Sequence, residues 1–193
     1  MLLFVAATIL GASALQALGG IFAAASQGCV LFLLHGLVGL HVVRTERAKL
    51  GAWLAPRGAL VVAGVAGGAA LVAVNVVYGF ALERAHVSAP DVVSLLRGLV
   101  PLPVLVVWAV GLAPVVEEMY FRGRLLDALD ARIGPRWSGA VTSVLFAAVH
   151  GVKAFFPALL VFGVALLWLR RRTGGLVASI LAHAINNAVA LIG

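Results

Sequence analysis

Long apolar segments constrain the fold of this chain more than any other feature. A helix needs about 20 apolar residues to cross a bilayer, and residues 2–43, with almost no charge, are long enough for two such helices. Of the 193 residues, 63% are hydrophobic and 11% are charged, whereas soluble domains carry about 25% charged residues. The sequence therefore predicts an all-α, polytopic transmembrane helical bundle.

We expect about seven spans, within bounds of six and eight, in one integral membrane domain over residues 1–193. The N-terminal run has no basic residues before it and is too long for the apolar core of a signal peptide, so we predict that it stays as a span. Gly19 and Gly20 mark a hairpin after it. The expected spans cover residues 2–43 (two spans), 58–82, about 98 to the glutamates at 117–118, 137–151, 154–169 and 174–192.

The net charge of +7 does not indicate nucleic-acid binding, because the basic residues lie in short clusters between apolar segments. With the N-terminus in the cytoplasm, only Arg84, Arg97 and Lys153 fall on the outer side, as the positive-inside rule requires. The composition favours a bacterial protein, and hence the inner (plasma) membrane. Indole rings prefer the membrane interface, and three tryptophans are predicted near the inner boundary: Trp53, Trp137 and Trp168.

A pair of carboxylates follows an apolar run, where ionisable groups are costly and usually functional. Glu118 and Arg122 are four residues apart, so they share a helix face and are predicted to pair. Glu117 is rotated by about 100° from Glu118. This predicts a structural Glu118–Arg122 pair and a Glu117 that is available for chemistry. Pro114, one turn earlier, predicts a kink in the same helix.

Two histidines on other predicted spans reach similar depths. At about 1.5 Å per residue, Glu117, His150 and His183 lie roughly 24, 22 and 16 Å from the ends of their helices. Phe146 is one turn before His150, and Asn187 is one turn after His183. Three spans therefore direct polar groups into one predicted cavity. A buried ion-pair network in a transporter or scaffold is the alternative.

Other polar and small residues in the spans are interpreted as packing features. His35 and His41 are predicted to be interfacial or packing residues, and Trp108 to be a packing residue. Helix–helix contacts are predicted for four further residues: Gln16, Gly64, Gly68 and Asn75.

Three motifs resemble those of a known family. They are E-E-x-x-x-R (Glu117, Glu118, Arg122), F-x-x-x-H (Phe146, His150) and H-x-x-x-N (His183, Asn187). Together they resemble the CPBP intramembrane proteases, which include the type II CAAX prenyl proteases and the bacterial Abi proteins. The resemblance covers residues 98–190, the predicted protease core.

This resemblance implies a helical membrane fold with a cavity open toward the cytoplasm, and peptide-bond hydrolysis. By position, Glu117 would activate water with the help of His150. His183 and Asn187 would stabilise the oxyanion. Glu118 and Arg122, together with Phe146, would support these groups.

The chemistry is reasonable in its own right, because a carboxylate in a low-dielectric cavity is a stronger base than in water. Glu117, His150 and His183 also match the ligand count of a catalytic zinc site with an open position. We favour a mechanism without a cofactor and keep a divalent metal such as zinc as the alternative. The chain contains neither H-E-x-x-H nor G-x-S-x-G, which disfavours zincin and serine-protease mechanisms.

The expected substrate is a membrane-anchored protein or peptide. Bacterial relatives are linked to the removal of C-terminal sorting signals and to bacteriocin processing.

Overall fold

The computed structural model describes residues 21–56 and 58–192. The predicted first span, the Gly19–Gly20 hairpin and Gln16 lie outside these residues. The described chain is helical with connecting loops and no strand, which confirms the all-α prediction. Its first three helices are α2 (Ile21–Thr45), α3 (Arg47–Leu54) and α4 (Gly58–Arg84).

A short helix precedes the predicted fourth span. In α5 (Val92–Leu99), the Asp91 side chain caps the first turn by accepting a hydrogen bond from the Ser94 backbone N–H at 2.9 Å. The span was expected from about residue 98, but the helix breaks at Val100, whose backbone is extended. The cause is Pro101, because proline disfavours the helical conformation of the residue before it.

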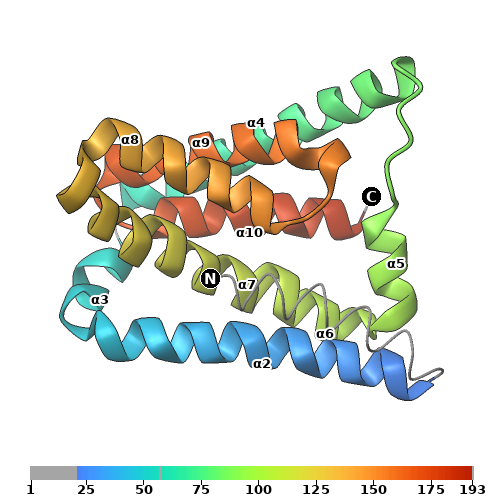
Figure 1. Cartoon of the computed structure of the whole chain (residues 1–193), viewed down its shortest axis with the longest axis horizontal. Helices are drawn as coiled ribbons and strands as arrows, with labels where there is room; N and C mark the ends of the chain where they lie inside the picture. The colour runs from blue at the N-terminus through green and yellow to red at the C-terminus, as the bar shows by residue number, and fades with distance from the viewer. Residues whose placement is uncertain (1–20, 57, 193) are drawn as a thin grey trace.

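From Leu102 to Val149 the chain forms 48 residues of nearly continuous helix. Gly134 interrupts this run with φ 79° and ψ 164°, a conformation that glycine adopts readily. Glycine and proline are common helix-stop residues, and at Gly134 and Pro135 α8 turns back (Figure 1). The successive elements are α6 (Leu102–Val106), η1 (Val107–Leu112), α7 (Ala113–Glu118), η2 (Met119–Leu125) and α8 (Leu126–Val149).

The last helices return across the bundle, and Gly174 ends α9 in the left-handed conformation at φ 70°. Within the described residues, three helices are long and apolar enough to cross a membrane and two shorter ones are apolar, as an integral membrane bundle requires. The final elements are η3 (Lys153–Phe155), α9 (Phe156–Thr173) and α10 (Val177–Ile192).

Helices α4 and α10 pack closely against each other, because glycines on α4 lie at their contact. A Cβ atom on Gly64 would lie 2.8 Å from the Leu181 Cβ, and one on Gly68 would lie 2.9 Å from the Ile185 Cβ. Further along α4, the Asn75 Nδ2 donates to the Asn186 Oδ1 at 2.7 Å. The predicted glycine face and the predicted interhelical hydrogen bond of Asn75 are both confirmed.

One end of the bundle gathers α3, the Gly134 turn and the α9–α10 turn (Figure 1). Trp53 lies there with only 3% of its surface exposed, and its backbone carbonyl accepts from the Leu176 N–H at 2.7 Å. Its ring packs where a Cβ on Gly123 would be, so Trp53 is a core residue rather than the interfacial indole that was predicted. Trp137 and Trp168 are 64% and 62% exposed, as interfacial indoles are.

Candidate active site

The predicted Glu118–Arg122 pair is present and buried. The Arg122 Nη1 donates to the Glu118 Oε1 at 2.8 Å, and the two side chains are 1% and 0% exposed. The Arg122 Nη2 also donates to the Gly163 carbonyl at 3.2 Å, which ties η2 to α9. A buried charge without its partner is strongly destabilising, so each member of this pair holds the other in place.

Phe146 links the pair to the histidines. Its ring is fully buried, and the Arg122 guanidinium carbon lies 4.2 Å from its centroid. The rings of His150, His183 and Phe162 lie 4.8, 5.9 and 5.8 Å from it, centroid to centroid. Phe146 therefore fixes the spacing between the cation and both imidazoles.

Glu117 points away from Arg122 toward a different partner. Its Oε1 lies 3.3 Å from the His35 Nε2. Its Oε2 is buried and has no hydrogen-bond partner among residues 21–56 and 58–192. His183, His150 and His35 all lie within Coulombic range of the carboxylate. One acid with three imidazoles around it is the centre of the candidate site.

His35 was predicted to be interfacial or a packing residue; it does pack against Trp108, but it also contacts Glu117, which was not predicted. It lies on α2, is 5% exposed, and contacts a carboxylate 82 positions later in the chain. Trp108, predicted to be a packing residue only, also directs its indole Nε1 at the His35 Nδ1 at 3.4 Å. The sequence holds one usable signal for His35, an ionisable residue inside an apolar run, but no motif connects it to Glu117.

His150 is oriented by its own helix. Its Nδ1 lies 2.7 Å from the Phe146 carbonyl oxygen, which can only accept, so Nδ1 carries the proton. The Nε2 of a neutral His150 is then left with its lone pair. This residue caps the end of α8 and is exposed, where a water molecule can reach it.

His183 lies deeper, with 3% of its surface exposed. Its Nδ1 is 3.4 Å from the Glu118 Oε1 but lacks hydrogen-bond geometry. Its ring stands edge-on to Phe162, with the centroids 5.0 Å apart. The Glu118 carboxylate thus faces both Arg122 and His183.

Asn187 bonds to an irregular stretch of helix. Its Nδ2 donates to the Ala109 carbonyl at 2.8 Å. In the π-helical η1, the Ala113 N–H bonds to Trp108, five residues back. The next N–H in that pattern would come from residue 114, and Pro114 has none. Asn187 therefore satisfies a carbonyl that the proline leaves open.

Glu117, His150 and His183 are the zinc ligands of the alternative mechanism. Among the residues that the structure describes, no group of three or more His, Cys, Asp or Glu side chains could hold a metal ion. Instead, the Glu117 Oε1 contacts His35, and the His183 Nδ1 faces Glu118. The mechanism below therefore assigns no step to a metal.

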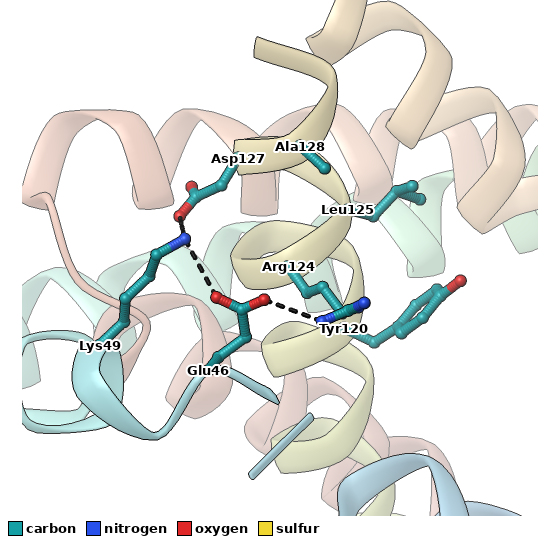
Figure 2. Close-up of a pocket in the computed structure, with 7 residues that line it drawn as sticks. All are labelled: Glu46, Lys49, Tyr120, Arg124, Leu125, Asp127 and Ala128. Carbon is teal, nitrogen blue, oxygen red and sulfur yellow. Dashed lines mark hydrogen bonds and ion pairs between the residues drawn. The ribbon is translucent and has the colours of Figure 1, made fainter. Parts of the chain in front are cut away.

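A pocket of about 240 Å³ lies away from these groups, where α3 meets η2 and α8. Figure 2 shows Lys49 between the carboxylates of Glu46 and Asp127, at 3.0 and 3.1 Å, with Arg124 on the other oxygen of Glu46. The hydrogen bonds to Glu46 and then Asp127 raise the pKa of Lys49. The residues around this pocket bond to one another, so it is a surface feature of the charged end rather than part of the acid–imidazole cluster.

Comparison with known families agrees with the motif-bearing half of the chain. A family model described as Type II CAAX prenyl endopeptidase Rce1-like matches residues 99–189. No curated protein and no solved structure gives a significant match. The matched segment contains every residue of the three motifs, whereas His35 lies outside it. Residues 99–189 are therefore similar to the Rce1-like type II CAAX prenyl endopeptidases, the family that the three motifs also resemble.

Proposed function

We propose that this membrane protein hydrolyses a peptide bond with Glu117 as the general base. The observation that carries the proposal is the state of its carboxylate. Oε1 is occupied by His35, while Oε2 is buried and unpartnered within the described chain. A buried polar atom without a partner is costly, and a water molecule bound to Oε2 would satisfy it.

In the proposed reaction, the Glu117 Oε2 removes a proton from this water. The hydroxide adds to the carbonyl carbon of the scissile bond and forms a tetrahedral oxyanion. The proton then passes from Glu117 to the amide nitrogen, the C–N bond breaks, and an acid and an amine are released. The His150 Nε2 accepts a hydrogen bond from the other O–H of the water. This bond fixes the position of the water.

His183 and Asn187 are the proposed donors to the oxyanion. An amide NH₂ has two donors, so Asn187 can bond to the Ala109 carbonyl and still offer its second N–H. His183 would donate from Nε2, because its Nδ1 faces Glu118. Each donor of this kind contributes about 2.7–4 kcal/mol of transition-state stabilisation in well-studied cases.

The proposed substrate is a peptide that is itself anchored in the bilayer, since the site lies among membrane-spanning helices. The family name points to a prenylated CAAX sequence. Removal of a C-terminal sorting signal and bacteriocin processing in a bacterial inner membrane are the other candidate roles, which the resemblance to bacterial family members implies. In each case, the proposed orientation places the arginine-rich end of the bundle in the cytoplasm.

The test is a cleavage assay in proteoliposomes with a farnesylated CAAX peptide as the probe. Glu117→Gln should lower kcat by about 10²- to 10⁴-fold, the usual contribution of a general base. His150→Ala and His183→Ala should also be inactive, while every variant inserts normally. Glu83→Gln, an exposed acid at the end of α4, is the matched control and should keep full activity. Activity of Glu117→Gln at the control level would support a scaffold or transporter with a buried ion-pair network.

The metal alternative is tested separately by adding a strong chelator to the wild type. The glutamate mechanism predicts unchanged turnover after chelation and dialysis. Loss of turnover that returns when zinc is added would establish the metal mechanism instead.

A further inference from the structure

We propose that His35 is a positioning residue of the active site, and that Trp108 sets its tautomer. This inference rests on the proposed function of Glu117. It extends the site to α2, a helix that precedes the family-matched segment.

The hydrogen-bond directions follow from the chemistry of the three groups. An indole N–H can only donate, so the His35 Nδ1, 3.4 Å from the Trp108 Nε1, must accept. The proton of a neutral imidazole then sits on Nε2, which lies 3.3 Å from the Glu117 Oε1. The carboxylate accepts this proton in a hydrogen bond. Trp108, His35 and Glu117 thus form one chain of donors and acceptors with a single consistent direction.

The packing around His35 holds this arrangement. The imidazole is 5% exposed, and its ring stands at 87° to the Trp108 ring, with the centroids 5.5 Å apart. The ring contact and the hydrogen bond to Trp108 together restrict rotation of the imidazole. A fixed donor on Oε1 in turn restricts rotation of the Glu117 carboxylate.

The consequence is a division of labour between two oxygens of one carboxylate. Oε1 accepts the hydrogen bond from His35, and Oε2 is the oxygen that would bind the water. Without the His35 donor, the carboxylate could turn, and either oxygen could bond to another imidazole nearby. His35 therefore acts on the rate of the chemical step through Glu117, without touching the substrate.

The kinetic test uses the farnesylated CAAX peptide and three variants. His35→Leu removes the donor, and we expect kcat to fall by about 10- to 100-fold, as for other partners that orient an active-site group, with little change in KM. His35→Gln keeps an N–H of similar reach and should recover most of this loss. Trp108→Phe keeps a ring but removes the indole donor, and should cause a smaller loss. His41→Ala, an exposed histidine on the same helix, is the control and should leave kcat unchanged.

Unfolding midpoints of all variants in detergent separate a role in positioning from a role in folding. We expect the midpoint of His35→Gln to lie close to that of the wild type. Wild-type kcat in His35→Leu would overturn the proposal. So would equal losses in His35→Gln and His35→Leu, because the N–H would then be irrelevant.

A second readout does not need turnover. In ¹⁵N-histidine-labelled protein, the His35 signals are identified by their absence from His35→Gln. They should show a protonated Nε2 and an unprotonated Nδ1, and the Nε2 signal should move in Glu117→Gln. A proton on Nδ1, or an unmoved Nε2 signal, would overturn the inference. If the wild type fails to cleave the peptide, the proposed function is contradicted. The tautomer measurement then still tests the hydrogen bond between His35 and Glu117.

Discussion

Glu117 and Glu118 are adjacent in sequence, yet their partners differ. Glu118 is fully buried beside Arg122, whereas Glu117 directs Oε1 at His35, and each carboxylate keeps Oε2 buried without a partner among the described residues. The helix rotation between neighbours was enough to predict the Glu118–Arg122 pair and a different direction for Glu117.

The buried pair gives a prediction for stability. Arg122→Met leaves Glu118 charged, buried and without its cation, and should lower the free energy of unfolding by about 3–5 kcal/mol. The double change Glu118→Met with Arg122→Met should recover much of this loss, because an apolar pair often replaces a buried ion pair without cost. Arg132→Met, at an exposed position, is the control. Thermal unfolding in detergent measures all three, and a double variant as unstable as Arg122→Met would contradict the pairwise interpretation.

Residue-level prediction succeeded where partners lie one helical turn apart and failed where they lie far apart in sequence. The Glu118–Arg122 hydrogen bond follows from i, i+4 spacing. The His35–Glu117 contact spans 82 positions and depends on how α2 docks against α7. No local periodicity encodes that docking, so His35 was interpreted as a packing residue.

At the level of elements, the helix that carries Glu117 is irregular on both sides of the acid. π-helical η1 precedes it, and π-helical η2 follows it. Such turns are frequent at functional sites. Pro114 was predicted to cause a kink. It lies in the first turn of α7, next to η1, and the π-helical turn there accommodates the missing backbone N–H of the proline. The bond from Asn187 to the Ala109 carbonyl was not predictable, because the two residues lie on helices that are far apart in sequence.

Pro114→Ala should therefore affect activity more than stability. The new N–H can bond to the Ala109 carbonyl, which removes the need for Asn187 as its donor. We expect unchanged or higher thermal stability together with a lower kcat, since Asn187 loses its fixed orientation. Pro157→Ala, in the first turn of α9, is the control and should change neither quantity. A clear loss of stability in Pro114→Ala would show that the proline stabilises η1 in another way.

The α4–α10 contact gives a second prediction for an element. Gly68→Leu forces a side chain into a position where even a Cβ would be 2.9 Å from Ile185. Overpacking of this kind costs about 1–3 kcal/mol, and separation of the helices would also break the Asn75–Asn186 bond. Gly79→Leu, on the same helix with nothing within 4 Å of its Cβ position, is the control. Equal unfolding midpoints for the two variants would argue against close packing of these helices.

For the whole molecule, the basic clusters collect at one end of the bundle and predict its orientation. Arg172 follows the apolar part of α9 and Lys153 precedes it, and both are exposed. On a Cys29→Ala background, Lys153→Cys should react with an impermeant maleimide from outside the cell. Arg172→Cys should react only after the membrane is permeabilised. The reverse pattern would place the arginine-rich end outside and contradict the positive-inside prediction.

The contact between α2 and Glu117 also bears on how such proteins are compared. The family model matches residues 99–189, yet the group that contacts the Glu117 Oε1 comes from residue 35. A fragment defined by sequence similarity would keep Glu117 and lose the histidine that contacts it. With the proposed role of His35, the segment that similarity detects is therefore shorter than the unit that reaches full activity.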